Sequence, residues 1–391
     1  MRRHNPIIAL FLMAGALICS CHGKDNPDES ISVNPATIEA AKDLASYKID
    51  VTSNCAWTVK AEGNDGEEAY WVTTSQASGK ENATVTIRVN ENIYNESRHA
   101  SIVFTTTGGK TASTVLTQEG SGGGAPGETG LRLGTYNLRM SNLDTDDVNK
   151  WSVRKERLKQ SIQDCNFDVF GVQEVSTEMQ DWLDNEFKDK YSFRYFSPYS
   201  QGGSGNRAQG IGYRKDAFVL SEWHFFWASD TPDNMSTNDT GSSGSFSRGA
   251  CCCIITHKQS GVRFFFMNTH ACLNGEPNAA YAGVHIEQEK RFNPEGLPSF
   301  FVGDMNARPE YKATQTYRTY WKDSYDTAKA RSGVSGSFNG FSSASGKYRI
   351  DYVYYRGNGI TIDDLCISNK LYDGKYASDH FPVIVNLKIS K

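Results

Sequence analysis

The sequence predicts two folded domains, a small all-β sandwich followed by a larger α/β domain. The 391 residues are too many for one ordinary domain and suit two. A Gly- and Ser-rich stretch, residues 120–130, cannot pack a core and is expected to be a linker. Before this linker, apolar residues alternate with polar ones at every second position. After it, apolar strands alternate with helical patterns, so the two halves belong to different fold classes.

The N-terminus is expected to direct export. After the basic start MRRH, an apolar stretch runs to Cys21 and is too short to span a bilayer, so residues 1–20 are predicted to be a signal peptide. The segment Ile18–Cys21 resembles a bacterial lipobox, which implies cleavage before Cys21 and lipid attachment to its thiol; an ordinary secreted protein is the alternative. Residues 21–29 form a polar acidic tether that is similar to the leaders of some outer-membrane lipoproteins. We therefore expect a cell-envelope lipoprotein that is anchored in the outer membrane through its lipid and exposed at the cell surface.

Residues 30–119 are predicted to form an immunoglobulin-like β-sandwich. Four segments alternate with a two-residue period and are rich in β-branched residues, with Gly108-Gly109 at a hairpin turn: YKIDVTS, ATVTIRVN, SIVFTTTGGK and STVLTQ. This region also resembles the BACON module of exported proteins from gut Bacteroidetes, which implies adhesion to glycan or mucin. Trp57 and Trp71 are expected in the core, because tryptophans of small sandwiches are usually buried; stacking on a glycan is the alternative.

Residues 131–391 are predicted to form an α/β domain whose sheets are covered by helices. Two segments have helical spacing, VRKERLKQSIQDC and STEMQDWLDNEFKD. Six segments are predicted to be strands, two of them apolar on both faces: LRLGTYNL, FDVFGVQE, VRFFFMNTH, PSFFVGD, RIDYVYY and FPVIVNLKI. Such a mixture is typical of layered sheets with helices outside.

Polar side chains stand where the predicted strands begin or end. Four of them each close a strand: Asn137, Glu174, His270 and Asp304. Asp351 opens another strand, and Asp379 and His380 together open the last one. Because the end of one antiparallel strand lies beside the start of its neighbour, all of them are expected to gather on one rim of a sheet. A polar rim on apolar strands is how a rigid scaffold holds a functional site.

These residue types suit a divalent cation and a phosphoryl group. Asp304 and Asn306 are two apart, so both side chains leave an extended backbone on the same face. Glu174 adds a second hard oxygen ligand of the kind that Mg²⁺ prefers, and Mg²⁺ takes its other ligands from water and substrate phosphate. His270 and His380 are two imidazoles fit for proton transfer or for stabilising charge on phosphate.

Together these segments resemble the motif series of the endonuclease/exonuclease/phosphatase superfamily, whose members include nucleases, sphingomyelinases and inositol-polyphosphate phosphatases. The motifs are TYNLR, VQEV, GYRKD, NTH, GDMNARP, RIDYVYY and SDHFPV, and the match covers residues 131–391. The resemblance implies a DNase I-like fold, a four-layered α/β/β/α sandwich with its site at the sheet edges. It also implies Mg²⁺ as the cofactor, with Mn²⁺ as a substitute, and in-line attack of water on a phosphoester.

The resemblance assigns the metal and the attacking water to particular residues. Glu174 corresponds to the principal Mg²⁺ ligand, Asn137 lies beside it in contact with the metal shell or phosphate, and Asp379 lies near the metal. Asp304 corresponds to the carboxylate that positions or deprotonates the attacking water. Asn306 corresponds to the amide that holds the phosphate.

The two histidines and two further residues complete the expected site. The chemistry of the residue types predicts that Asp351 accepts a hydrogen bond from His380 and fixes its tautomer. The resemblance implies that His380 is a general base, as in some members, or a phosphate stabiliser, as in others, and that His270 lies on the leaving-group side. Tyr213 and Arg248 are candidate substrate-binding residues, because Arg248 suits bidentate contact with phosphate. A structural role for Tyr213 and a surface position for Arg248 are the alternatives.

Two positions depart from the family pattern. Bacterial relatives often carry an acidic residue two positions after the histidine of the NTH motif, where this chain has Cys272. Between Asn206 and Tyr213, where some members place a carboxylate that supports the first histidine, the chain has Arg207 and Gln209. Both departures concern the leaving-group side, so the choice between a phosphomonoester and a phosphodiester stays open.

The charge of the chain restricts the partners. The formal net charge is −4 and the isoelectric point about 6.1, so the chain lacks the broad basic field that binds nucleic acid tightly. The expected partner is a phosphoester substrate, with nucleic acid, phospholipid and a small phosphate ester as the open choices. The alternative function is a non-catalytic surface lipoprotein that binds glycan or mucin and keeps a degenerate phosphoesterase domain. We expect a monomer.

The consecutive cysteines Cys251, Cys252 and Cys253 are expected to be packing residues rather than a metal or redox centre. On a strand, Cys251 and Cys253 share one face and Cys252 points to the other, which does not suit a tetrahedral site. Seven cysteines follow Cys21 without regular spacing, so no disulfide framework is predicted.

Overall fold

The computed structural model describes residues 29–63, 69, 71–92, 97–120, 128–198, 208–242 and 244–390. The predicted signal peptide, the lipidation site at Cys21 and most of the predicted linker lie outside these residues. Within them, no helix is both long enough and apolar enough to cross a membrane.

The N-terminal strands form two sheets that face each other. One sheet has the order β1-β3-β7-β5 and the other the order β2-β9-β8-β4-β6. The strands are β1 (Ile31–Asn34), β2 (Thr37–Ala40), β3 (Ala45–Ser53), β4 (Trp57–Gly63), β5 (Val72–Thr74), β6 (Ser78–Gly79), β7 (Ala83–Val89), β8 (Arg98–Thr106) and β9 (Thr111–Gln118). Their inward side chains form one core that contains Trp57 and Trp71, so the core position predicted for both tryptophans is confirmed.

The C-terminal part begins with a seven-stranded sheet of order β12-β13-β11-β10-β24-β23-β21. Its strands are β10 (Glu128–Asn137), β11 (Val169–Val175), β12 (Tyr191–Phe196), β13 (Ala208–Arg214), β21 (Ala330–Gly333), β23 (Ile360–Ile367) and β24 (Val383–Ser390). The central strands β10 and β11 run parallel, and β24 runs antiparallel to β10. The start of β24 therefore lies beside the end of β10.

A second sheet of six strands has the order β14-β17-β18-β19-β22-β20. Its strands are β14 (Phe218–Trp227), β17 (Gly249–His257), β18 (Arg263–His270), β19 (Ser299–Asp304), β20 (Lys322–Asp323) and β22 (Asp351–Arg356). The parallel strands β18 and β19 end together, and β22 starts where β19 ends, with Asp304 opposite Asp351. A separate hairpin, β15 (Asp239–Gly241) with β16 (Gly244–Phe246), precedes β17.

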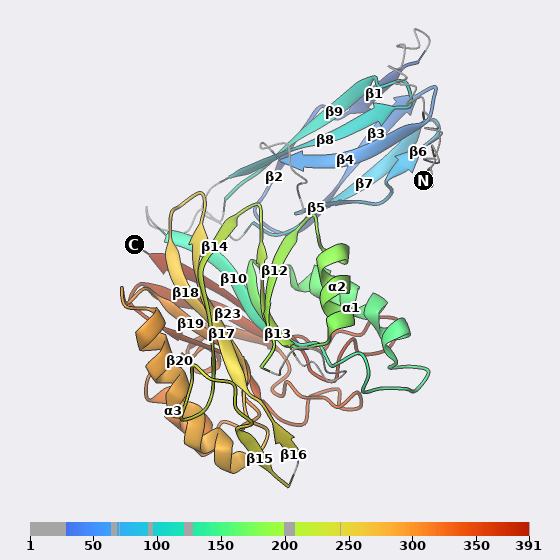
Figure 1. Cartoon of the computed structure of the whole chain (residues 1–391). Helices are drawn as coiled ribbons and strands as arrows, with labels where there is room; N and C mark the ends of the chain where they lie inside the picture. Colours follow the sequence, from blue (N-terminus) through green and yellow to red (C-terminus); the bar gives the residue numbers. More distant parts are fainter. Residues whose placement is uncertain are drawn as a thin grey trace, which may run out of the picture.

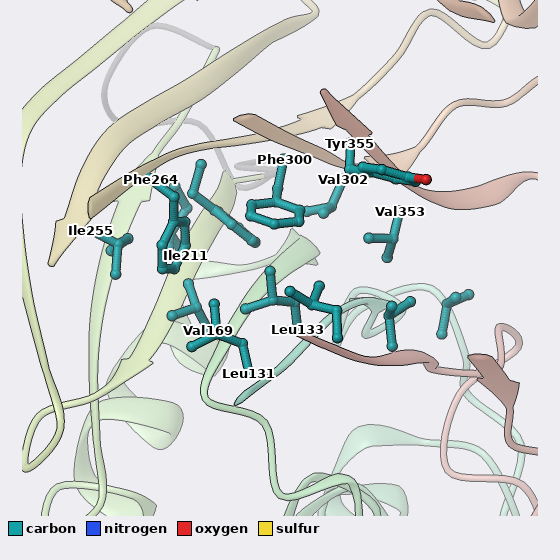
Figure 2. Close-up of a cluster of buried hydrophobic side chains, with 14 of the residues drawn as sticks. Leu131, Leu133, Val169, Ile211, Ile255, Phe264, Phe300, Val302, Val353 and Tyr355 are labelled. Carbon is teal, nitrogen blue, oxygen red and sulfur yellow. The ribbon is translucent and has the colours of Figure 1, made fainter. Parts of the chain in front are cut away.

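The two large sheets pack face to face and carry helices on their outer faces. Figure 2 shows part of the core between them, where Leu133 and Val169 of one sheet face Phe300 and Val302 of the other. Helices α1 (Trp151–Cys165) and α2 (Thr177–Glu186) cover the seven-stranded sheet, and α3 (Gly275–Phe292) and α4 (Lys312–Arg318) cover the six-stranded one; α5 (Ser324–Thr327) is a single turn. Figure 1 shows α1 and α2 in green on one side and α3 in orange on the other. This is the predicted four-layered α/β/β/α fold.

The cysteine triplet contributes to two of these cores. Cys251 and Cys253 pack between the sheets, whereas Cys252 packs under α3 and α4, and all three are fully buried. Burial raises the pKa of each thiol, so all three stay protonated and apolar in character. The predicted packing role is confirmed.

The predicted polar rim belongs to two sheets rather than to one. Asn137 and Glu174 lie at strand ends of the seven-stranded sheet, whereas His270 and Asp304 end strands of the six-stranded sheet. The single-sheet prediction was wrong because a sequence pattern gives the ends of strands but not the sheet to which each strand belongs. The strand ends still meet, because the two sheets stack.

Candidate active site

Side chains from both sheets meet at one oxygen, Oδ2 of the buried Asp304. The amide Nδ2 of Asn137 donates a hydrogen bond to it at 3.0 Å. Nε2 of His270 lies 3.5 Å from the same oxygen, and Nε2 of His380 lies 3.8 Å from it. Four residues that the sequence predicted for the site are thus brought together from β10, β18, β19 and the segment before β24.

Asp351 and His380 form an oriented pair. Oδ2 of Asp351 lies 2.8 Å from Nδ1 of His380, which is the hydrogen bond that the residue types predicted. The backbone N–H of Asp351 donates to Oγ of Ser337 at 3.0 Å, and the ring of Phe338 meets the imidazole edge-on at 5.1 Å between centroids. These contacts fix the imidazole so that its other nitrogen faces Asp304.

The local charges give His380 and Asp304 different protonation states. Burial by itself lowers the pKa of His380, but the charges of Asp351 and Asp304 outweigh burial and raise that pKa to about 10. Burial raises the pKa of Asp304 to about 7, with the charge of Asp351 adding to the rise and that of His380 opposing it. At neutral pH, His380 is therefore a cation, and Asp304 is the group that can accept a proton.

His270 and Asn306 are held by their neighbours at the end of the six-stranded sheet. The backbone N–H of His270 donates to Oε1 of Gln209 at 2.6 Å, so the side chain of Gln209 holds the backbone of this histidine. The backbone N–H of Asn306 donates to Oδ1 of Asp304 at 2.9 Å, and its Nδ2 donates to the carbonyl of Ala271 at 3.1 Å. An amide nitrogen carries two N–H groups, so Asn306 has one more to offer a substrate. Its φ of +47° is a left-handed conformation that asparagine tolerates.

Glu174 and Asp379 place two carboxylates on the opposite side of the site. Glu174 has a φ of +59° at a register shift in β11, and such a bulge turns a side chain out of the regular ladder. Oδ2 of Asp379 lies 3.2 Å from Nη1 of Arg139. Burial raises the pKa of Asp379, and the charge of Glu174 adds to this rise against the opposing charges of His380 and Arg139. A bound cation would relieve the repulsion between the two carboxylates.

The donor set fits a hard divalent cation. Among the described residues, the carboxylate of Glu174 has one hydrogen bond, from the backbone N–H of Met140 at 3.2 Å, which leaves oxygen lone pairs for a ligand. The carboxyl and imidazole ligand atoms of Asp304, Asp351 and His380 all lie within 4.8 Å of one another, and Oδ1 of Asp351 is buried without a hydrogen-bond partner. Carboxylate and amide oxygens in this arrangement suit Mg²⁺ or Mn²⁺.

These residues line a cleft of about 510 Å³. One wall is aromatic and apolar, with Phe338, Tyr348, Tyr311 and Ile350, and two exposed leucines, Leu143 and Leu273, stand at the rim. Among the predicted site residues, the cleft lining includes Glu174, Arg248, His270, Asp304, Asn306, Asp379 and His380. Asn137 and Asp351 lie behind this surface and contact it through Asp304 and His380.

Tyr213 is not part of this cleft. Strand β13 runs antiparallel to β11, so Ala208 lies beside Val175, and Tyr213 lies opposite Val169 at the far end of the sheet. There it is half-buried against the core between the sheets. The substrate-binding role predicted for Tyr213 does not fit this position, because the direction of β13 carries it away from Glu174.

Arg248 does line the cleft, but it is buried rather than exposed at the surface. Its Nε lies 3.2 Å from Oδ2 of Asp239, a carboxylate of β15 that is fully buried. Cys272 lies beside this pair, and burial together with the charge of Asp239 raises the pKa of its thiol to about 12. Cys272 is therefore neutral at physiological pH and does not replace an acid, whereas Asp239 supplies a carboxylate in this region from a different element.

Two residues of the cleft lining, and one residue that holds Arg248, were not singled out in the sequence. Arg139 pairs with both carboxylate oxygens of Asp144 at 3.0 Å and reaches Asp379. The guanidinium of Arg308 lies 3.7 Å from the ring centre of Tyr348. Arg139 and Arg308 belong to the motifs TYNLR and GDMNARP and could have been found there, whereas Asp239 lies in a Ser-, Thr- and Asn-rich loop that carries no motif.

The fold and the site define a phosphoesterase-type domain, and sequence comparison agrees. The chain belongs to the Endonuclease/Exonuclease/phosphatase family, whose sequence model matches residues 134–380. The BACON family, described as a putative N-terminal binding domain, matches residues 57–119. Enzymes of the first family generally depend on a divalent metal. No curated protein matches the chain in sequence.

Solved structures of Bacteroides proteins resemble a large part of this chain. A family protein from Bacteroides thetaiotaomicron is 25% identical, with a TM-score of 0.61 over 68% of this chain and 99% of that one. A family protein from Bacteroides vulgatus is also 25% identical, with a TM-score of 0.61 over 67% and 100% of the two chains. A mannosyl-6-phosphatase from Bacteroides thetaiotaomicron is 25% identical, with a TM-score of 0.59 over 66% and 99%.

Proposed function

We propose that this protein is an exported, divalent-metal-dependent phosphoesterase that hydrolyses a small phosphate ester, with a hexose phosphate as the first candidate substrate. The observation that carries the proposal is the convergence of Asn137, His270 and His380 on Oδ2 of Asp304 at the wall of one cleft. Structural packing alone does not call for two imidazoles, an amide and a carboxylate at the meeting point of two sheets.

Asp304 and His380 divide the acid–base work. The pKa of about 7 makes Asp304 a carboxylate that can orient a water and take its proton near neutral pH. The pKa of about 10 keeps His380 protonated, so it stabilises negative charge on the phosphoryl oxygens rather than acting as a base. Asp351 holds His380 in that state and orientation through the 2.8 Å hydrogen bond.

His270 and Asn306 act on the other side of the phosphate. His270 ends β18 and Asn306 follows the parallel neighbour β19, and both side chains line the same cleft. The second N–H of Asn306 would hold a phosphoryl oxygen, and His270 would donate a hydrogen bond to the leaving oxygen.

Glu174, Asp379 and Asn137 are the residues that would hold the metal. When bound, Mg²⁺ would neutralise charge that develops on the phosphoryl oxygens, and Mn²⁺ has the same preference for oxygen donors. Glu174 contributes its free carboxylate oxygen, whereas Arg139 balances the charge of Asp379 and keeps it aimed at the site.

A small sugar phosphate is favoured over nucleic acid or phospholipid by two lines of support. The mannosyl-6-phosphatase that is 25% identical aligns over 99% of its own length, so a phosphatase acting on a sugar phosphate uses this fold at similar size. The cleft wall offers the rings of Tyr348, Phe338 and Tyr311, which suit stacking against a pyranose, and the formal net charge of −4 gives no field for a polyanion.

The test is release of phosphate or p-nitrophenol by the full chain after chelation and re-addition of Mg²⁺ or Mn²⁺. The substrates are mannose 6-phosphate, p-nitrophenyl phosphate, bis-p-nitrophenyl phosphate, DNA and sphingomyelin. We expect metal-dependent turnover that Glu174→Ala and His380→Ala each reduce by at least ~10²-fold. Glu295→Ala, which removes an exposed ion pair with Arg263, is the matched control and should leave turnover unchanged. Equal rates in wild type, Glu174→Ala and His380→Ala on every substrate would support the alternative, a surface-binding protein without turnover.

Export, lipidation and glycan binding remain parts of the proposal that need their own tests. Residues 1–20 would direct export, and Cys21 would carry the lipid that anchors the protein in the outer membrane. Cys21→Ala should then release the protein from membranes into the soluble fraction. Because Trp57 and Trp71 are buried, glycan or mucin binding by the N-terminal sandwich would use other side chains, and a pulldown with residues 30–119 tests it.

A further inference from the structure

A buried guanidinium faces the cleft beside His270. Arg248 immediately precedes β17, whose first residue, Gly249, pairs with His270. The side chains of Arg248 and His270 therefore lie at the same rim of the sheet. Arg248 is 3% exposed, yet it contributes to the cleft lining together with His270 and Leu273. The cation is therefore largely removed from bulk water and open to whatever occupies the cleft.

The position of Arg248 is set by Asp239 rather than by the catalytic residues. Oδ2 of Asp239 lies 3.2 Å from Nε of Arg248 and accepts the backbone N–H of Leu273 at 2.6 Å. Its Oδ1 accepts the backbone N–H of Asn274 at 2.9 Å and the side-chain Nδ2 at 2.7 Å. The backbone of Arg248 is held separately, by Asn238 Oδ1 at 2.8 Å. One carboxylate thus ties the guanidinium to the loop that follows His270.

The outer nitrogens of this guanidinium have unused donors. A guanidinium carries five N–H groups, and only the one on Nε is taken up by Asp239. Among the described residues, Nη1 and Nη2 make no hydrogen bond, and the guanidinium carbon lies 5.2 Å from the centre of the Phe246 ring. Asp239 balances the charge of this guanidinium, but buried N–H groups without an acceptor are costly, and a planar pair of N–H groups matches two oxygens of a phosphate.

The other two arginines of the cleft lining have different surroundings. Arg139 has a bidentate pair with Asp144 and a contact with Asp379. The guanidinium of Arg308 packs against the ring of Tyr348, 3.7 Å from its centre, and Arg308 is only half-buried. Among the described residues that line the cleft, Arg248 is therefore the fully buried arginine, and its outer N–H groups make no hydrogen bond.

We propose that Arg248, positioned by Asp239, selects a dianionic phosphate monoester over a diester. A monoester has three non-bridging oxygens and close to two negative charges at neutral pH, because its second pKa is near 6. A diester has two such oxygens and one charge, and a substituent occupies the place of the third oxygen. The outer N–H groups of Arg248 bind the additional charged oxygen of the monoester. A diester has no such oxygen and forms no comparable hydrogen bonds with Arg248. This assignment rests on the proposed phosphoesterase function and identifies the group that decides between its two ester classes.

The test compares kcat/KM for p-nitrophenyl phosphate and bis-p-nitrophenyl phosphate, which share one leaving group, in the full chain with Mg²⁺. Arg248→Met should lower kcat/KM for the monoester by ~10–100-fold, because that is the effect expected when hydrogen bonds to a charged group are lost. It should change kcat/KM for the diester less than about 3-fold. Arg248→Lys should be intermediate, because an ammonium cannot form the bidentate contact. Asp239→Asn should lower the same monoester-to-diester ratio by a smaller factor.

Controls come from a matched pair outside the cleft. Arg291 and Asp233 form an exposed ion pair at 2.7 Å, so Arg291→Met and Asp233→Asn make the same chemical changes and should leave both substrates unaffected. Thermal midpoints of all variants separate loss of fold from loss of selectivity, and Arg248→Lys keeps the comparison available if the methionine variant unfolds. An equal loss on both esters, or no loss on either, overturns the assignment, as does a wild type that hydrolyses the diester faster.

Binding of inorganic phosphate distinguishes this assignment from the proposed function. We expect calorimetric titration to show at least ~10-fold weaker phosphate binding in Arg248→Met than in wild type or Arg291→Met. If turnover is absent but this difference holds, the proposed function fails and the anion site at Arg248 stands. If turnover is present but phosphate binding and ester selectivity are the same in Arg248→Met, the assignment of Arg248 fails and the phosphoesterase stands.

Discussion

Replacing Asp351 by asparagine tests how this protein sets the charge of His380. The substitution keeps the size and the oxygen of the side chain but removes the carboxylate charge that lies 2.8 Å from Nδ1 of His380. It leaves Asp304, whose Oδ2 is 3.8 Å from Nε2, as the remaining carboxylate of the group. Both carboxylates raise the pKa of His380 against the effect of burial, and Asp351 is the larger contributor.

The magnitude follows from the rise of that pKa to about 10. Compared with an ordinary histidine at about 6.5, the folded protein favours the imidazolium by ~5 kcal/mol. If Asp351 supplies at least half of this, Asp351→Asn lowers the proton affinity of His380 by at least about 60-fold. Because the pKa is raised on folding, the stability that the ion pair contributes is complete below about pH 6.5 and is lost as the pH rises through about 10.

The assay is the pH dependence of kcat for p-nitrophenyl phosphate between pH 6 and pH 10. In the wild type, we expect an acid limb near 7 from Asp304 and an alkaline limb near 10 from His380. In Asp351→Asn both limbs move to lower pH, because Asp351 raises the pKa of both groups. The ratio of variant to wild-type activity should therefore fall a further ~10-fold between pH 7 and pH 9. NMR titration of the imidazole checks the assignment directly.

An alkaline limb that stays in place in Asp351→Asn would refute this reasoning, as would a ratio that does not change with pH. Asp363→Asn is the control, since it removes a carboxylate paired with Lys329 at the surface and should leave the profile unchanged. A lower thermal midpoint with an unchanged profile would mean that Asp351 supports the fold without setting the charge of His380.

Three further predictions concern the metal, acid stability and the strand end. Glu174→Gln should weaken binding of Mn²⁺ by ~10–100-fold in calorimetric titration, because one of two facing carboxylates loses its charge; unchanged affinity would remove Glu174 from the metal site. Burial lowers the pKa of His285 to about 4, so its contribution to stability is complete above about pH 6.5 and declines as the pH falls towards 4. Urea unfolding should show that the wild type loses ~2–3 kcal/mol more than His285→Phe between pH 7 and pH 4, and equal losses would contradict a buried neutral imidazole. Gly303→Ala should lower the free energy of unfolding by at least ~2 kcal/mol, because φ is +142° and an added Cβ would lie 2.0 Å from the carbonyl oxygen of Thr269. Gly283→Ala in α3 is the control, because the space around Gly283 is open. Equal thermal midpoints of the two variants would exclude strain at Gly303.

The layered fold was predictable because strand ends and helical periods are local properties of the sequence. The segments FDVFGVQE and PSFFVGD have central stretches, VFGV and FFV, without polar side chains, as strands covered on both faces require, and they form β11 and β19 in the middle of their sheets. The distribution of strands between two sheets depends on contacts between distant segments, and no local pattern of residues encodes it. For this reason the site was expected on one sheet and lies on two.

The site shows the same division between what is local and what is not. Residues at strand ends next to recognisable motifs, such as Glu174, Asp304 and His380, were identified and lie at the cleft. Tyr213 was a candidate for substrate binding with a structural role as the alternative, and the direction of β13 places it at the far end of the sheet, where the structural role fits. Asp239 was missed because it acts through the fold of a hairpin loop, and only the structure shows which groups its carboxylate meets.

The split of the site between two sheets also determines when it can form during synthesis. Asn137 meets its partner Asp304 after 167 further residues, and His380 follows Asp304 in the sequence. Contacts of such long range form late, because closing a large loop costs entropy before any contact is made. A nascent chain that has made most of both sheets would still lack His380 and the strand that fixes it. The site would therefore be incomplete until the segment that contains His380 has been synthesised.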